Sequence, residues 1–149
     1  MSDASTERGE LTITRIFAAR PEILFECMTS PEHLTHFWGP TGTSTPLERI
    51  VVEPRPSGRF ETVMVNDESG DEYPVLGVFV EFESPRMFSF IEAGVEGGMK
   101  TVITFNDLGD GRTEMVTHQT QVPAMFTSPE AQAGLQTMFD KLDRHLSSL

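Results

Sequence analysis

The sequence predicts an α+β fold in which a curved antiparallel sheet of about seven strands packs against one long C-terminal helix. Most of residues 46–122 read as strands separated by short turns, and residues 128–149 change to a helical repeat. Strands joined by turns this short must be antiparallel neighbours, because parallel strands need long crossovers. A one-sided sheet and an amphipathic helix then share one core.

The N-terminal part predicts one strand followed by two short helices. Residues 1–9 are small and polar, which indicates a flexible N-terminus ahead of a single domain at 10–149. Residues 10–17 alternate apolar and polar side chains, as in a strand. Pro21 and Pro31 each stand where the first turn of a helix tolerates a missing N–H. Gly39 and Pro40 end the second helix, directly after Trp38.

The remaining elements follow from turn residues and apolar spacing. Strands are expected at 46–54, 58–66, 73–83, 87–93, 99–107 and 113–122. In the final segment, Ser128 is the expected cap and Pro129 the first helical residue, and apolar residues recur at steps of three and four. Gly134 inside this helix costs about 1 kcal/mol relative to Ala. We therefore expect close packing, or room for another group, at that point.

Charge and composition exclude several function classes. The formal net charge is −12 and no basic stripe is visible, which disfavours nucleic-acid binding. Cys27 is the single cysteine, so no internal disulfide is possible. No apolar stretch reaches signal-peptide or membrane-span length, so we expect a cytoplasmic protein that does not insert into membranes.

Five stretches occur in the order seen in one known family: residues 11–40, 53–60, 77–90, 109–115 and 133–146. Over residues 10–149 the chain resembles the stand-alone bacterial relatives of the heat-shock-protein-90 ATPase activator, in the START and birch-pollen-allergen-like helix-grip (SRPBCC) superfamily. Phe37-Trp38 stands where many relatives have two tryptophans. The resemblance implies a sheet gripping the C-terminal helix, with a hydrophobic cavity between them that the two short helices close on one side.

Three functions are compatible with this fold, because a fold does not settle function. We expect non-catalytic binding of an unknown small hydrophobic or amphipathic molecule in the cavity. The alternative is a small cavity enzyme of the polyketide cyclase/aromatase or hydrolase kind, and the third option is a chaperone-interacting domain. No cofactor is expected. Relatives in this family are seen as monomers or dimers, and we expect a homodimer for this chain.

The expected ligand-binding wall consists of apolar residues from the strands, the second short helix and the C-terminal helix. They are Phe37, Trp38, Phe60, Met64, Leu76, Val78, Val80, Phe88, Phe90, Met99, Ile103, Met115, Leu135, Met138, Phe139 and Leu142. The indole of Trp38 is expected to be mostly buried, with its N–H bonded to a partner and its edge at the cavity. Met125 and Phe126 are candidates for a movable lid.

Polar anchors are fewer. Arg15 shares strand parity with apolar residues, which predicts either pairing with a carboxylate of the chain, the favoured interpretation, or binding of an anionic ligand group. His118 and Gln119 occupy opposite faces of one strand, and the sequence leaves open which of them faces the cavity. Neither a catalytic group nor a metal site is expected, because His33 and His36 lack further converging ligands.

Overall fold

In a computed structural model the described residues are 8–92, 98–123 and 127–149. Their elements are β1 (Arg8–Phe17), α1 (Pro21–Thr29), α2 (Pro31–Phe37), β2 (Thr43–Ser44), a 3-10 helix (Leu47–Arg49), β3 (Val51–Val52), β4 (Arg59–Asn66), β5 (Glu72–Glu83), β6 (Met87–Glu92), β7 (Lys100–Asp107), β8 (Thr113–Pro123) and α3 (Pro129–Ser147). No described helix is both long and apolar enough to span a bilayer. The α+β fold class is confirmed.

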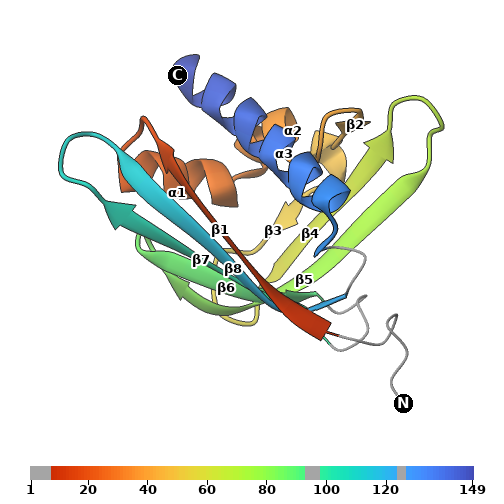
Figure 1. Cartoon of the computed structure of the whole chain (residues 1–149), viewed down its shortest axis with the longest axis horizontal. Coiled ribbons are helices and arrows are strands. Elements are labelled where there is room, and N and C mark those ends of the chain that lie inside the picture. Colours follow the sequence, from red (N-terminus) through yellow and green to blue (C-terminus); the bar gives the residue numbers. More distant parts are fainter. Residues whose placement is uncertain (1–7, 93–97, 124–126) are drawn as a thin grey trace.

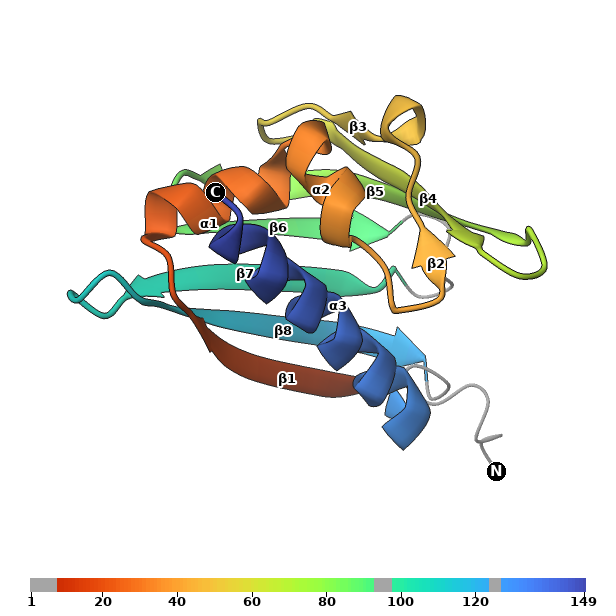
Figure 2. The same ribbon diagram turned by 90° about the horizontal axis from the view of Figure 1, so that it is seen from above.

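The strands form one eight-stranded antiparallel sheet in the order β1-β8-β7-β6-β5-β4-β2, and β3 pairs with β4. The first strand therefore pairs with the last one. The sheet curves, α3 lies across its concave side, and α1 and α2 lie over the same side near the C-terminal end of α3 (Figures 1 and 2). Ser128 caps α3 as expected, because its hydroxyl accepts a hydrogen bond of 3.1 Å from the N–H of Ala131.

The core is built largely from phenylalanine rings. Phe25 of α1 makes edge contacts with Phe88 of β6 and Phe105 of β7, at centroid distances of 5.7 and 5.2 Å. Phe60 of β4 stacks on Phe90 of β6 at 5.0 Å. These rings join α1 to the middle strands, so this end of the molecule is filled by side chains.

The segment 46–54 differs from the single strand expected there. It forms a 3-10 helix followed by the two-residue strand β3. Leu47 is 45% exposed, so the first half of the segment has no core to face. The two-residue strand β2, which pairs with the far end of β4, was not anticipated.

The inward placement expected for part of β5 is wrong. Leu76, Val78 and Val80 are exposed on the outer face, at 47, 41 and 42%, whereas Phe79 is buried. Both faces of β5 carry apolar residues, so alternation alone does not decide its orientation. The inner position belongs to Gly77, where an added Cβ would lie 2.9 Å from the carbonyl oxygen of Phe60. Neighbouring strands therefore already fill the space inside β5.

Candidate functional site

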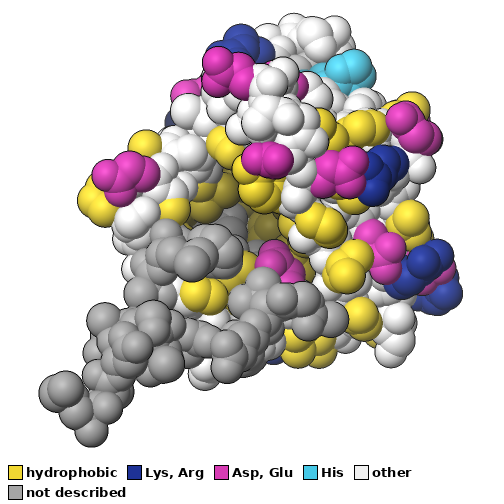
Figure 3. Space-filling model, turned by 90° about the vertical axis from the view of Figure 1, so that its right-hand side faces the viewer, with side chains coloured by type: hydrophobic (Ala, Val, Ile, Leu, Met, Phe, Trp, Pro, Cys, Tyr) yellow, Lys and Arg dark blue, Asp and Glu magenta, His cyan; other side chains and the backbone are white. Residues whose placement is uncertain are grey.

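A cavity of about 1190 Å³ lies between the N-terminal half of α3 and the concave side of the sheet. Figure 3 shows a hollow bordered mainly by hydrophobic side chains, with acidic side chains at and within it. This volume is somewhat above the roughly 300–1,000 Å³ of typical small-molecule pockets, so the cavity is large enough for a small organic molecule. The resemblance implied a hydrophobic cavity in this position, between the sheet and the C-terminal helix.

Nine of the residues predicted for the site line this cavity. They are Trp38, Met64, Phe90, Met99, Ile103, Leu135, Met138, Phe139 and Gln119. Five others lie in the packed core and contribute no cavity surface: Phe37, Phe60, Phe88, Met115 and Leu142. The exposed residues of β5 (Leu76, Val78 and Val80) are on the opposite face of the sheet. The five core residues do face inward, but they lie too deep to reach the cavity. The three residues of β5 were assigned to the wrong face of their strand.

The corner after α2 forms one wall of the cavity. Gly39 has φ +96°, and a Cβ there would lie 2.6 Å from Thr43 Oγ1, so the tight corner requires glycine. Thr43 Oγ1 donates to the carbonyl of Pro40 at 2.7 Å. The N–H of Thr41 donates to Thr137 Oγ1 of α3 at 3.0 Å. These bonds hold the corner, and with it Trp38, against α3.

Two buried polar atoms belong to residues that line the cavity and have no hydrogen-bond partner in the described part of the chain. They are the indole Nε1 of Trp38 and the hydroxyl Oγ1 of Thr117 on β8. Contrary to the expectation, the indole N–H has no partner among residues 8–92, 98–123 and 127–149. The Trp38 ring packs edge-on against Phe60 at 5.4 Å and also borders the cavity. Buried polar atoms without a partner are costly, and here both are at the cavity wall.

Gln119, and not His118, borders the cavity. The side-chain amide of Gln119 donates to Thr101 Oγ1 of β7 at 3.2 Å. His118 does not line the cavity, and its Nδ1 lies 2.8 Å from Thr12 Oγ1 of β1. The alternation of β8 thus settles the orientation that the sequence left open.

The sequence interpretation missed the acidic residues that line the cavity, which are Asp67, Glu68, Glu72, Glu92 and Glu130. Glu92 lies at the end of β6. It lines the cavity, and among the described residues its carboxylate has no hydrogen bond or ion pair. Burial raises the pKa of Glu92 to about 7. Strand parity could have revealed it, because Phe88, Phe90 and Glu92 are two residues apart and share one face. A carboxyl group that titrates near neutrality in an apolar hollow is a marker of a functional site.

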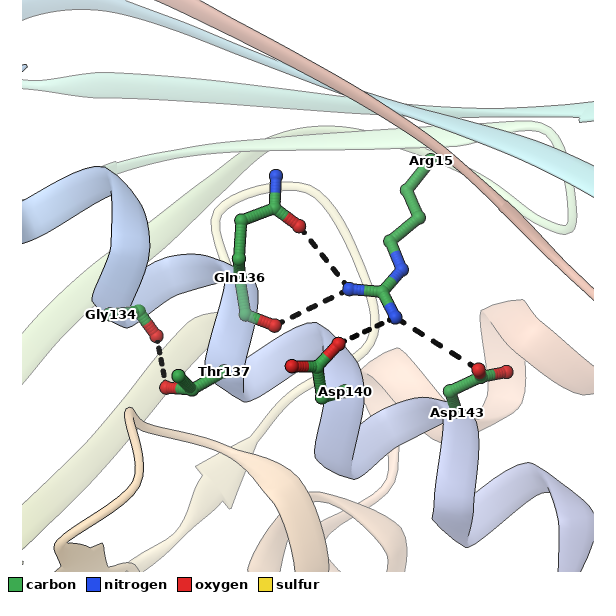
Figure 4. Close-up of polar contacts among 6 residues, drawn as sticks. All are labelled: Arg15, Gly134, Gln136, Thr137, Asp140 and Asp143. Atoms are coloured by element: carbon green, nitrogen blue, oxygen red, sulfur yellow. Dashed lines mark hydrogen bonds and ion pairs between the residues drawn. The ribbon is translucent and has the colours of Figure 1, made fainter. Parts of the chain in front are cut away.

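Arg15 points from β1 to α3 and does not line the cavity. Its Nη2 lies 2.8 Å from a carboxylate oxygen of Asp140 and 3.9 Å from one of Asp143 (Figure 4). Its Nη1 donates to the carbonyl and the side-chain oxygen of Gln136, at 3.3 and 3.2 Å. The geometry therefore favours the intramolecular pairing over an anionic ligand: Arg15 fastens the helix to the first strand.

A second group of polar side chains lies between the helices, where α1, α2 and α3 meet. Cys27, His33 and His145 each offer one ligand atom, and these atoms lie within 4.8 Å of one another. His33 Nδ1 is 2.8 Å from His145 Nε2, and the ring of His36 stacks on that of His145 at 5.0 Å. The sequence pointed to His33 and His36 but not to His145, which is 112 residues beyond His33.

Burial has opposite effects on the pKa values of two members of this group. It raises the pKa of the Cys27 thiol to about 11, with a further contribution from the charge of Glu26. It lowers the pKa of His145, and the nearby His33 and His36 act in the same direction. The imidazole of His145 is therefore favoured in its neutral form.

The proposed lid residues Met125 and Phe126 lie outside the described residues.

The model of one protein family, described as Activator of Hsp90 ATPase homolog 1-like protein, matches residues 18–147. No curated protein matches the chain. Among solved structures, a protein from Rhodobacter sphaeroides aligns with TM-score 0.82 and 23% identity, over 96% of this chain and 99% of that one. A protein from Chromobacterium violaceum gives 0.81 and 20%, over 91% and 94%. One from Silicibacter pomeroyi gives 0.78 and 21%, over 93% and 98%. At these identities the structures show a shared fold.

Proposed function

The chain belongs to the Activator of Hsp90 ATPase homolog 1-like family, and from this premise we propose that its cavity binds one small amphipathic molecule. A single observation carries the proposal. The lining residues of an apolar hollow of about 1190 Å³ include Glu92, Thr117 and Trp38, which carry buried or half-buried polar groups without partners among the described residues. A ligand that occupies the hollow would bury apolar surface and place its polar end beside Glu92.

The apolar walls support a hydrophobic ligand body. Met64, Phe90 and Ile103 border the hollow on the sheet side, and Leu135 and Met138 border it on the helix side. Burying apolar ligand surface against them contributes about 25 cal/mol per Å² before the costs of binding are counted. Methionine side chains adapt their shape readily, which suits a wall that closes around a flexible molecule.

Glu92 supports a ligand with a hydrogen-bond donor at its polar end, most effectively an amine. A half-buried carboxylate without a partner destabilises the folded protein, so its presence is better explained by a function than by folding. An ammonium group near it would replace the missing partner with a charge-assisted hydrogen bond. A ligand carboxylate would instead be repelled by the ionised Glu92.

Native mass spectrometry of untagged, gently purified protein tests for a retained molecule, and a matched ligand series tests the chemistry. An alkyl amine, alcohol and carboxylate of one chain length are titrated into the wild type and Glu92→Gln. We expect the amine to bind most tightly and the carboxylate most weakly. We expect Glu92→Gln to reduce amine affinity by about tenfold or more, the worth of a hydrogen bond to a charged group, and to leave the alcohol nearly unchanged.

Arg15→Met serves as the matched control, because Arg15 does not line the cavity. It should retain the affinity for the amine. The amine should also bind more tightly as pH rises through about 7, because Glu92 ionises in that range. An apo mass together with failure of all three ligands to bind would contradict the proposal.

The second candidate is an enzyme that uses Glu92 as a general acid or base. The observation that favours it is the raised pKa of Glu92, about 7, since a catalytic carboxyl works best when it titrates near the operating pH. A molecule recovered from the protein is incubated with the wild type and with Glu92→Gln, and its mass is followed. Conversion by the wild type only supports catalysis, whereas an unchanged molecule that both proteins bind supports a binding role.

A further inference from the structure

The meeting point of the three helices gathers metal-ligating side chains from distant parts of the chain. Cys27 comes from α1, His33 from α2 and His145 from α3, and one ligand atom of each lies within 4.8 Å of the other two. None of the three lines the cavity. This group is therefore separate from the site proposed above and does not depend on it.

We propose that Cys27, His33 and His145 form a binding site for a zinc ion, with solvent as the fourth ligand. Sulfur and imidazole nitrogen are the donors that zinc prefers, and three protein ligands with one open position is a common zinc arrangement. A metal site was not expected from the sequence, because no further ligand was in view beside His33 and His36. The fold supplies the missing ligands, from α1 and from the last turns of α3.

The spacing of the donors fits zinc after small movements. With Zn–N near 2.0–2.1 Å and Zn–S near 2.3 Å, tetrahedral geometry separates two nitrogens by about 3.3 Å and nitrogen from sulfur by about 3.6 Å. His33 Nδ1 and His145 Nε2 are 2.8 Å apart, so the ion would open this contact by about half an ångström. The sulfur would approach the nitrogens from a separation of at most 4.8 Å.

The surroundings orient the ligands. The ring of His36 stacks on that of His145 with an interplanar angle of 17°, and the ring of Phe37 lies tilted to the same imidazole at a centroid distance of 6.2 Å. Glu26, whose charge acts on Cys27, and the net charge of −12 both favour a cation.

Zinc binding is measured by calorimetry on untagged protein, with Co²⁺ as a spectroscopic substitute. We expect one zinc ion per chain, thiolate-to-cobalt charge transfer, and visible bands of tetrahedral intensity. Because zinc binds cysteine as the thiolate, binding should release a proton, seen as a dependence of the binding enthalpy on the buffer. The bound ion should also raise the melting temperature.

His145→Gln, His33→Gln and Cys27→Ser should each weaken zinc binding by more than the roughly 10–100-fold that loss of a residue around the ligands costs. His118→Gln is the matched control, since His118 lies on the outer side of β8 and contacts Thr12. Circular dichroism checks that each variant is folded. His33→Gln and His145→Gln change half-buried residues, so they keep the test decisive if Cys27→Ser fails to fold.

Three outcomes would overturn the proposal. The first is the absence of stoichiometric binding to the wild type. The second is binding that survives His145→Gln and His33→Gln as well as it survives His118→Gln. The third is a cobalt spectrum without thiolate charge transfer. Any of them would leave the group as a contact between helices and nothing more.

Discussion

The two halves of helix α3 differ in how closely they pack against the rest of the molecule. The C-terminal half is packed and paired: Leu142 is fully buried, Phe139 meets Phe17 edge-on at 6.1 Å, and Asp140 holds Arg15. The N-terminal half stands over the cavity, with Gly134 and Leu135 on its wall. A helix fastened at one end can hold its other end over space that side chains do not fill. Stability is thus concentrated away from the candidate site.

Removing the same side chain from each half gives the largest expected contrast. Leu142→Ala should lower the free energy of unfolding by about 2–5 kcal/mol, because it opens a void in a filled core. Leu135→Ala should cost about 1 kcal/mol, because its side chain is only partly buried and already borders a hollow. Urea unfolding measures both. Equal losses would contradict the idea that the two halves pack differently.

Glu92→Gln should stabilise the protein, and the gain should depend on pH. The folded pKa of about 7 lies above the ordinary 4.5, so the folded wild type holds the proton more tightly between these values. Its free energy of unfolding therefore falls as pH rises through this window, by up to about 3 kcal/mol at 1.36 kcal/mol per pKa unit. The variant lacks this loss, so its advantage should be smallest near pH 4.5 and largest above about pH 7.

The matched comparison is the difference between the two unfolding curves at each pH, since all other titrating groups are shared. A difference that stays constant from pH 4.5 to 8 would mean that Glu92 is solvated like an ordinary surface carboxylate. It would also remove the main support for a polar ligand group at that position.

Arg15→Met tests the fastened half with a smaller effect. Loss of the contacts to Gln136, Asp140 and Asp143 should cost about 1 kcal/mol, because the carboxylates are half exposed and solvent screens them. A double-mutant cycle with Asp140→Asn isolates the pair. A large loss of ligand affinity in Arg15→Met would contradict its assignment as a fastening residue.

Gly134→Ala gives the smallest expected change and probes the open half. An added Cβ would lie 3.5 Å from Cβ of Pro40, an ordinary contact, so the helix should gain up to about 1 kcal/mol. The glycine is therefore not needed for close packing, and room at the cavity wall explains it better. Thermal unfolding measures the gain, and a marked destabilisation would show that the corner packs more tightly than the distance indicates.

The fold could be predicted from the sequence, because turn residues and the periodicity of apolar residues are local features of the chain. The strands from 58 to 122 and helix α3 follow from them directly. Local patterns failed where two faces carry similar side chains: Leu76, Val78 and Val80 of β5 look as apolar as Phe79, and only the neighbouring strands decide which set is buried. They also failed at 46–54, where a short segment pairs only briefly with β4.

The candidate site was only partly predictable, since depth is a property of the assembled fold. The sequence identifies apolar residues on the inner face but does not separate a cavity wall such as Ile103 from a filled core such as Met115. Glu92 was within reach of strand parity. His145 was not, because its meeting with His33 depends on how α2 and α3 cross.

Trp38 offers the most direct measurement, because it is the only tryptophan and its indole N–H gives a single signal in an NMR spectrum. That N–H is buried at the cavity wall and has no partner among the described residues. If an alkyl amine occupies the cavity, the indole resonance should move as the amine is added and reach a plateau with one ligand per chain. An indole resonance that stays in place while the amine saturates the protein would contradict binding in this cavity.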